Sequence, residues 1–357
     1  MADKEFRQVR RDRRTLAMML ALPLLLLVVF GYAASFNITE LQVEIVGPQA
    51  DAVRSALEQL GADQGITIEV TEVDEGGTRA TAEEDLRNGE NTVAVVTGES
   101  AGSRPLALID GSQLFSAQAA ITGLAKAPVD IGTEVLFNPD LDTSAYMVPA
   151  IIGLILVFIG TMVTSLGIVK EREAGTLEQL AVMPFTARDI IAGKLLPYFA
   201  IGLVDLAIVT TVGVLLFDVP FRGPIWQLAL GGVVFLMATM GFGVLISTVS
   251  NTQGQAIQLA LMVTLPQVLL SGMVFPLESM AAGVRWIAYV LPLTYFVQIS
   301  RNVMIRGTEF GAMWEPYVAL AVLGGVVFGL ALFRFRRDLG PSRRMQRRLA
   351  RDVEEAG

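Results

Sequence analysis

The stretch TLAMMLALPLLLLVVFGYAA, residues 15–34, decides the class of protein, because it is uncharged and long enough to cross a bilayer as a helix. A basic segment precedes it, containing Lys4, Arg7, Arg10, Arg11, Arg13 and Arg14. A cleaved signal peptide is an alternative, since Gly31-Tyr32-Ala33 places small residues where cleavage would need them. The apolar run is longer than the core of a typical signal peptide, so we expect a retained membrane anchor.

Other apolar stretches continue the same pattern along a chain that is 53% hydrophobic and only 17% charged. By length they predict further spans at Tyr146–Ile168, Ile191–Phe217, Trp226–Val249, Gln255–Phe275 and Met313–Phe333. Residues 276–290 are too short and too interrupted to cross, and we expect a re-entrant or interfacial segment there. The predicted fold class is an α-helical polytopic membrane protein with about six transmembrane helices, of which residues 146–333 hold all but the first.

The distribution of charge predicts the orientation of these spans. Residues 1–14 and the tail at 334–357 are rich in arginine, whereas residues 35–145 carry five basic residues against nineteen acidic ones. Lys and Arg are retained on the cytoplasmic side, so we expect both termini inside and residues 35–145 outside the cytoplasmic membrane. A basic tail next to a span is more typical of contact with anionic membrane lipid than with nucleic acid.

Residues 35–145 are expected to form a small α/β extracytoplasmic domain between the first two spans. Alternating apolar residues predict strands at 41–46, 67–73, 92–97 and 105–109, and the remaining patterns predict helices at 51–60 and 113–126. The many carboxylates lack the spacing of a calcium loop and indicate a solvated acidic face. The chain has no Cys and no His, so we expect neither a metal site nor a familiar catalytic constellation.

The stretch EREAGTLEQLAVMP, residues 171–184, lies between the second and third predicted spans on the inner side. Gly175 suits the left-handed residue that ends one helix, and Thr176 with Gln179 forms a capping box that opens another. Pro184 then ends it. This pattern predicts a short cytoplasmic helix with polar and apolar faces.

Such a helix could dock on a soluble partner and pass its motion to the attached spans. An ordinary interfacial helix is the alternative. The candidate coupling residues are Glu171, Arg172, Glu173, Gly175, Thr176, Leu177, Glu178 and Leu180.

The same stretch, followed by GKLLPY at 193–198, resembles the signature of type-2 ABC exporter permeases. Similar matches to that family lie in order around it, at Asn138-Pro139, MVP 147–149, LSGMVFPLESM 270–280 and PLTYF 292–296. The resemblance covers nearly the whole chain. It implies six spans, a large outer domain after the first, a coupling helix at about 170–183 that contacts a nucleotide-binding subunit, and a path between two copies.

The ATPase itself is expected to be a separate polypeptide. The phosphate-binding run G-x-x-x-x-G-K-[ST] does not occur in this sequence, and Gly193-Lys194 is followed by Leu195. We therefore expect no cofactor in this chain, with ATP and Mg²⁺ bound by two copies of a partner ATPase. Two ATPase copies imply a homodimer of this chain.

Candidate pathway residues are polar groups within the predicted spans. Asp205 is the one carboxylate well inside a span, and it either meets cargo or a coupled ion or is a structural carboxylate. Thr264, Gln267 and Ser271 share one helical face, and Thr164 lies on another; such faces also join helices. The apolar composition fits a hydrophobic or amphipathic cargo.

Other classes share some of these features. An ion-coupled secondary transporter would want several buried carboxylates or an inverted repeat, and the sequence shows neither. A membrane scaffold or sensor that signals to a cytoplasmic partner is a second alternative. A membrane enzyme would need a Ser/Lys or paired-carboxylate site that the spans do not offer.

Overall fold

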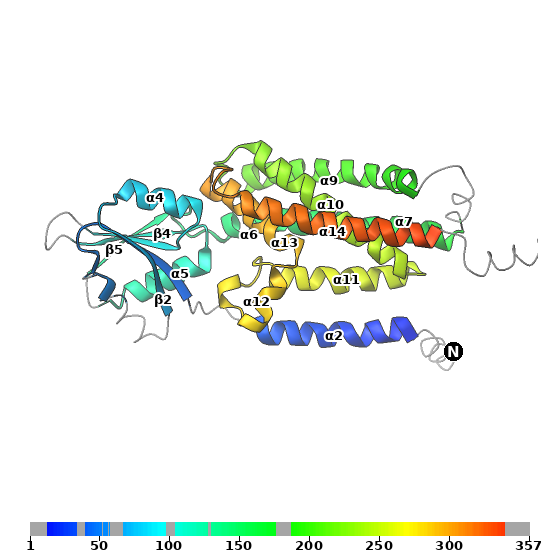
Figure 1. The fold of residues 1–357 in the computed structure, drawn as a ribbon, viewed down its shortest axis with the longest axis horizontal. Helices are drawn as coiled ribbons and strands as arrows, with labels where there is room; N and C mark the ends of the chain where they lie inside the picture. Colours follow the sequence, from blue (N-terminus) through cyan, green and yellow to red (C-terminus); the bar gives the residue numbers. More distant parts are fainter. Residues whose placement is uncertain are drawn as a thin grey trace, which may run out of the picture.

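A computed structural model describes residues 13–33, 40–51, 53–55, 57, 67–97, 104–127, 130–175 and 187–339. The chain forms an elongated molecule with a sheet domain at one end and a bundle of apolar helices at the other (Figure 1). The described part of the first helix begins at the bundle end remote from the sheet, and the last helix ends there too. The described ends of the chain therefore lie at the same end of the bundle.

The sheet domain holds a mixed five-stranded sheet of order β2-β1-β3-β4-β5. Within this described sheet, β3 and β4 pair antiparallel, and the other neighbouring strands pair parallel. The strands are β1 Glu40–Val46, β2 Thr67–Asp74, β3 Val93–Val96, β4 Leu106–Asp110 and β5 Gly132–Leu136. The four strands predicted from alternation are present, whereas β5 was not predicted.

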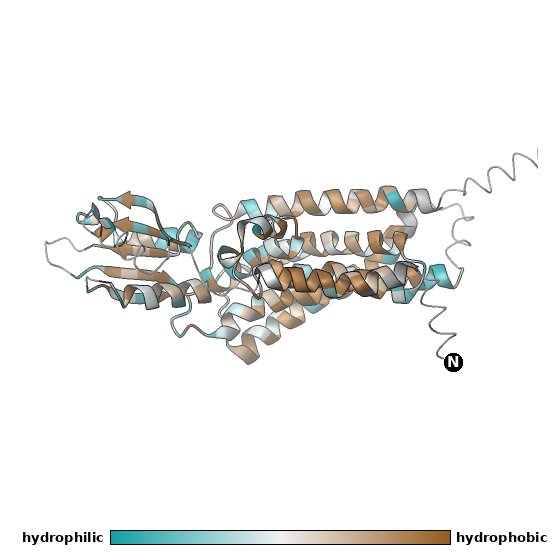
Figure 2. Cartoon of the chain, turned by 90° about the horizontal axis from the view of Figure 1, so that it is seen from below, coloured by the Kyte–Doolittle hydropathy of each residue, from teal (hydrophilic) through white to brown (hydrophobic). Residues whose placement is uncertain are grey.

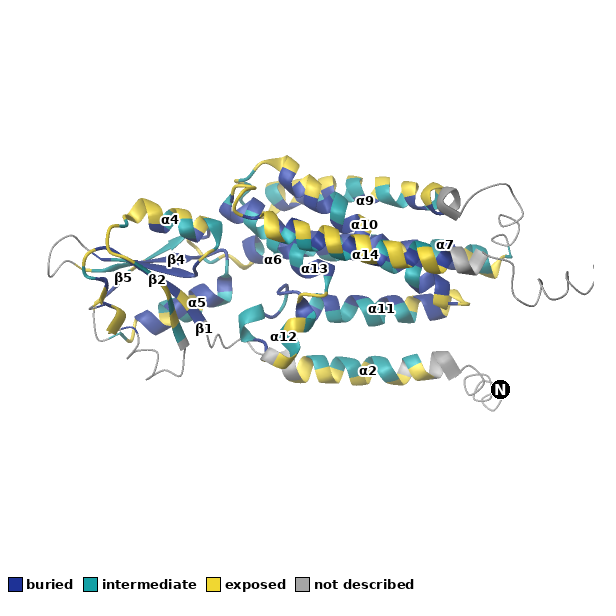
Figure 3. Ribbon diagram, in the orientation of Figure 1, coloured by how far each residue is buried: buried dark blue, intermediate teal, exposed yellow. Residues whose placement is uncertain are grey.

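Helices cover both faces of the sheet because alternate strand residues point to opposite sides. Helix α5, Leu114–Leu124, packs with the helical residues around Val53 and Leu57 on the face that includes Ile45 and Ile109. Helix α4, Arg79–Asn88, packs on the other face against Leu108. The central strands β1, β3 and β4 are largely buried between these helices, whereas the edge strands β2 and β5 are half-buried or exposed (Figure 3).

Glu44 is a buried carboxyl on the α4 face of the sheet and is only 2% exposed. Its carboxylate accepts a hydrogen bond from Asn91 Nδ2 at 3.1 Å. Burial, together with the negative charges of Asp85 and Glu72, raises the pKa of Glu44 to about 7. The folded domain thus keeps the carboxyl group of Glu44 protonated at pH values where the unfolded chain has already released that proton.

We therefore expect the sheet domain to lose stability as pH rises from about 4.5 to about 7, and Glu44→Gln to remove this loss. The pKa shift corresponds to about 3 kcal/mol. Hydrogen exchange of the sheet-domain amides at pH 5 and pH 8, corrected for intrinsic exchange, measures it. Glu84→Gln changes an exposed carboxyl and is the control. An unchanged pH dependence in Glu44→Gln would contradict the assignment.

The bundle contains four helices that are long and apolar enough to cross a membrane, among the residues that the structure describes. They are Thr143–Glu173, Ile191–Phe217, Ile225–Val249 and Trp314–Phe335. The corresponding elements are α6 Thr143–Val157, the π-helical turn η1 Phe158–Val163, α7 Thr164–Glu173, α9 Ala187–Phe217, α10 Ile225–Val249 and α14 Trp314–Leu339. Hydrophobic residues predominate along these helices (Figure 2). Many of them are exposed on the outside of the bundle, and Leu215 is 77% exposed.

Two further helices complete the bundle, α2 Arg13–Ala33 and α11 Gln253–Leu270, which pack against each other. Neither is among the four candidate spans, so six membrane crossings remain a prediction. The predicted span Gln255–Phe275 was placed too far along the chain. Helix α11 ends at Leu270 because Gly272 adopts a left-handed φ of 80° and Pro276 follows.

The chain after α11 folds into short helices at the sheet-domain end of the bundle (Figure 1). They are η2 Leu277–Ser279, α12 Ala282–Ala288, α13 Pro292–Arg301 and the π-helical turn η3 Asn302–Arg306. Helix α13, which was not predicted, enters the bundle core, where Phe296 stacks on Phe235 with ring centroids 4.6 Å apart. These short elements connect the bundle to the sheet domain.

All three tryptophans of the chain lie at this end of the bundle. Trp226 and Trp314 lie at the starts of α10 and α14, and Trp286 lies on α12. Their exposed fractions are 51%, 50% and 62%. Exposed tryptophans of this kind gather at the headgroup level of a bilayer. This level therefore marks the boundary between bundle and sheet domain.

Candidate functional site

The end of α7 binds three other helices through three consecutive side chains, which we call the α7 clamp (Glu171, Arg172 and Glu173). Glu171 forms an ion pair with Lys194 of α9. Arg172 Nη1 donates to the carbonyl oxygen of Ser250, at the end of α10, over 3.2 Å. The clamp therefore ties α7 to α9 and α10 at the end of the bundle remote from the sheet domain.

Glu173 binds the third helix, α11. Its carboxylate accepts from the backbone nitrogen of Gln253 at 3.0 Å and from Gln253 Nε2 at 2.6 Å. Gln253 is the first residue of α11, where backbone N–H groups lack partners within the helix and the helix dipole favours negative charge. A carboxylate at this position stabilises the helix and fixes its start to the end of α7.

Helix α7 ends directly after the clamp. Gly175 adopts a left-handed φ of 71°, as predicted, and its backbone nitrogen donates to the carbonyl oxygen of Arg172 at 3.1 Å. Residues 170–173 belong to α7, so the predicted coupling helix at 170–183 does not begin at residue 170. The remaining candidate residues, Thr176, Leu177, Glu178 and Leu180, lie outside the described residues, and the docking helix stays a prediction.

The structure places the candidate pathway residues in two different surroundings. Thr264, Gln267 and Ser271 are all buried. In the described part of the chain, Gln267 Oε1 and Ser271 Oγ have no hydrogen-bond partner. Asp205 is half-buried on α9 beside Val204, which is 57% exposed. Helix α9 lies on the other side of the bundle from α11 (Figure 1). The five predicted residues thus do not form one cluster.

Thr164 serves helix packing in this arrangement. It is fully buried and its Oγ1 donates to the carbonyl oxygen of Ile159 at 3.5 Å. A Cβ at Gly243 of α10 would lie 2.8 Å from Thr164 Cβ and 2.6 Å from the carbonyl oxygen of Gly160. The backbones of η1 and α10 therefore approach closely at this point, which requires glycine.

A buried ion pair joins the sheet domain to the bundle and was not predicted. Asp110, at the end of β4, and Arg306, at the end of η3, are 0% and 7% exposed. Arg306 Nε donates to Asp110 Oδ2 at 3.0 Å and to Ser112 Oγ at 2.9 Å. Gly89 contacts the same guanidinium with a left-handed φ of 82°, and a Cβ there would clash with Arg306 Nη1.

Further hydrogen bonds strengthen this junction. Thr308 Oγ1 donates to the carbonyl oxygen of Arg87 at 2.6 Å. Arg222, in the connection between α9 and α10, donates from Nη1 to the carbonyl oxygen of Phe137 at 2.8 Å. One sequence signal could have identified Arg222 and Arg306. Both are basic residues in segments expected outside, whereas basic residues are normally retained on the cytoplasmic side.

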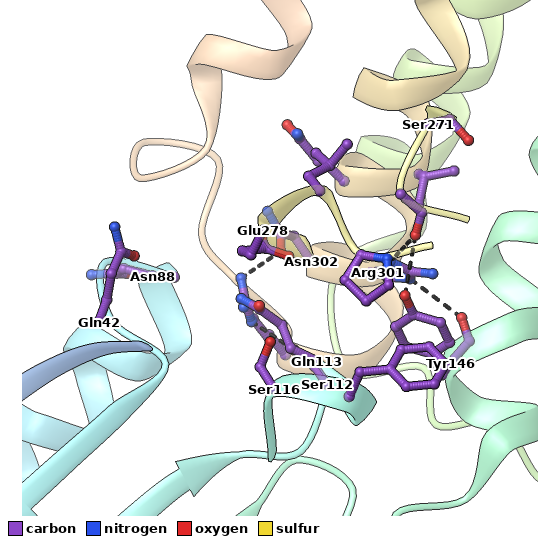
Figure 4. A pocket seen from close by; sticks show the side chains of 18 residues that line it. Gln42, Asn88, Ser112, Gln113, Ser116, Tyr146, Ser271, Glu278, Arg301 and Asn302 are labelled. Carbon is purple, nitrogen blue, oxygen red and sulfur yellow. Dashed lines mark hydrogen bonds between the residues drawn. The ribbon is translucent and has the colours of Figure 1, made fainter. Parts of the chain in front are cut away.

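A cavity of about 290 Å³ lies beside the ion pair, between the sheet domain, the start of α6, the end of α11 and α13 (Figure 4). Arg301 and Tyr146 both line this cavity. The guanidinium carbon of Arg301 lies 3.6 Å from the ring centroid of Tyr146. Arg301 Nη1 and Tyr146 Oη both donate to the carbonyl oxygen of Gly272, at 3.0 and 3.1 Å. Ser271 also lines the cavity, so the polar face of α11 leads to it.

An apolar helical bundle that ends in a charged clamp on one side and a soluble sheet domain on the other defines an integral membrane protein. Residues 13–333 match the model of the ABC-2 family transporter proteins, and the chain belongs to this family. It is accordingly a permease subunit of an ABC transporter.

Relatives include the probable multidrug ABC transporter permease YbhS of Escherichia coli K12, which is 30% identical over 370 positions covering 94% of this chain and 96% of YbhS. The inner membrane transport permease YhhJ of the same organism is 35% identical over 219 positions, 59% of this chain and 57% of YhhJ. ABC transporter G family member 20 of Dictyostelium discoideum is 28% identical over 204 positions, 56% of this chain and 28% of that protein.

Proposed function

We propose that this chain is the membrane-spanning subunit of an ATP-driven exporter that works as a homodimer with two copies of a separate ATPase subunit. The α7 clamp is the observation that carries this proposal. It ties α7 to α9, α10 and α11 one residue before Ala174 and Gly175 end the helix. The clamp residues and the segment that follows them belong to the stretch at about 170–183 for which the resemblance implies a coupling helix.

Motion of the ATPase would reach the spans through this connection. A force on residues 176–183 enters α7 at its end, and the clamp passes it to the starts of α9 and α11 and to the end of α10. Coupling between distant sites needs such a contiguous rigid element with two arrangements. ATP and Mg²⁺ would bind to the partner, since the sequence contains no phosphate-binding run of its own.

The cargo is proposed to be hydrophobic or amphipathic, and to move outward across the cytoplasmic membrane. The buried polar atoms of Gln267 and Ser271 give α11 a polar face within an apolar bundle, and this face leads to the cavity at the sheet domain. Polar groups inside a membrane bundle are costly and mark substrate paths. YbhS is named a probable multidrug permease, which agrees with a cargo of this class.

Cysteine labelling tests the proposed orientation, with the sheet domain outside and the clamp inside. The chain has no native Cys. Thr122→Cys, on an exposed face of α5, is expected to react with an impermeant maleimide in intact cells, whereas Gly254→Cys, at the exposed start of α11, reacts only after lysis. Labelling of both positions in intact cells, or of Gly254→Cys alone, would contradict the orientation.

A further inference from the structure

A second cleft, of about 340 Å³, lies at the junction between the sheet domain and the bundle. Three arginines from separate elements line it: Arg87 of α4, Arg222 between α9 and α10, and Arg306 of η3. Glu83 is the single acidic residue of the lining. The cleft therefore gathers basic side chains from both parts of the molecule.

Two of these arginines have no carboxylate partner within the described residues. Arg306 is neutralised by Asp110. Arg79 Nε forms an ion pair with the carboxylate of Glu83 at 2.7 Å. Glu83 therefore neutralises Arg79, and Arg87 and Arg222 have no carboxylate partner among the described residues. The pKa of Arg222 is lowered by its partial burial and by the positive charge of Arg87. Two like charges thus face one open cleft, and an anion there would relieve their repulsion.

The cleft opens at the level of the membrane headgroups. Arg222 precedes Trp226, whose ring centroid is 5.3 Å from that of Phe310. Phe310 in turn lies 5.1 Å from Tyr317. Aromatic clusters of this kind sit at the boundary of the bilayer. Both Arg87 and Arg222 are exposed at this boundary, on the side that carries the sheet domain.

We propose that the cleft binds the phosphate of an anionic phospholipid of the outer leaflet, with Arg87 and Arg222 as its ligands. Guanidinium groups match the oxygens of a phosphate with paired N–H donors. A phosphate held between α4 and the α9–α10 connection links the sheet domain to the bundle beside the Arg306–Asp110 pair. This role is independent of the ATPase partner and of the cargo, and its assignment to the outer leaflet rests on the proposed orientation.

Native mass spectrometry of the purified chain in detergent, titrated with phosphatidylglycerol or phosphatidylcholine, tests the proposal. Phosphatidylglycerol is expected to bind more tightly than phosphatidylcholine. Arg87→Gln, which leaves the hydrogen bonds of Arg222 intact, should weaken phosphatidylglycerol about fivefold, and the double variant Arg87→Gln/Arg222→Gln still more. Arg104→Gln removes another exposed arginine of the sheet domain, paired with Asp130, and is expected to change nothing.

Competition with inorganic phosphate separates the two sources of the anion. A lipid site keeps phosphatidylglycerol in the presence of millimolar phosphate, whereas a site for free phosphate loses it. Displacement by phosphate would overturn the lipid assignment. Equal binding of both lipids, or an Arg87→Gln variant that binds phosphatidylglycerol as tightly as Arg104→Gln does, would overturn the site itself.

Discussion

Arg306→Met is expected to loosen the sheet domain from the bundle at a cost of about 3–5 kcal/mol, because it leaves the carboxylate of Asp110 buried without its cation. Asp110 is completely buried, and Arg306 also holds Ser112 and Asn302. Hydrogen exchange of the η3 and α5 amides, together with the thermal unfolding midpoint, measures the change. Arg104→Met breaks an exposed ion pair in the same domain and should cost less than about 1 kcal/mol.

A double variant shows that the buried charge, and not lost packing, causes the effect. Arg306→Met/Asp110→Leu removes both charges and is expected to recover most of the stability that Arg306→Met loses. If Arg306→Met is no less stable than Arg104→Met, the ion pair does not hold the junction. If the double variant is as unstable as the single one, the stabilisation comes from packing and neighbouring hydrogen bonds instead.

The spans and strands could be predicted because their signals are local. A run of apolar residues long enough for a bilayer, and the alternation of the β1 to β4 segments, need no knowledge of distant partners. Gly175 likewise ends α7 through its own backbone freedom. The predicted last span, Met313–Phe333, agrees to within two residues with the candidate span Trp314–Phe335, and helix α14 itself continues beyond it to Leu339.

Other elements gave weak or misleading signals. Helix α4 is rich in charge and buries only Ala82 and Leu86, so its periodicity is faint, and its capping box uses Thr81 in place of the usual Glu or Gln. The π-helical turn η1 interrupts what the sequence shows as one continuous apolar span. Hydropathy reports neither this turn nor the close approach of η1 to α10.

The clamp and the junction could not be predicted because their partners come from distant parts of the chain. Asp110 and Arg306 are 196 residues apart, and Glu173 and Gln253 are 80 apart. From the sequence, Glu173 was expected to face a soluble partner. The structure shows its carboxylate on the start of α11, so we expect its substitution to impair coupling while the ATPase still associates.

Glu173→Lys is expected to reduce export strongly while leaving the complex with the ATPase assembled. The substitution puts a cation at the start of α11, where the helix dipole and free N–H groups repel it, and so separates α7 from α11. ATP hydrolysis continues, but its motion no longer reaches α11. The loss of a typical coupling free energy between two sites corresponds to a fall in export of about tenfold or more. Glu84→Lys, an exposed position of the sheet domain, is the charge-matched control.

The most direct measurement compares these variants in proteoliposomes that contain the chain and its ATPase subunit. ATP hydrolysis and ATP-driven transport of a fluorescent amphipathic dye are recorded on the same sample. The proposed function predicts that wild type and Glu84→Lys transport the dye, and that Glu173→Lys hydrolyses ATP at a similar rate with transport reduced about tenfold or more. Normal transport by Glu173→Lys would show that the α7 clamp does not couple the ATPase to the spans, and absence of ATP-driven transport by the wild type would contradict the exporter itself.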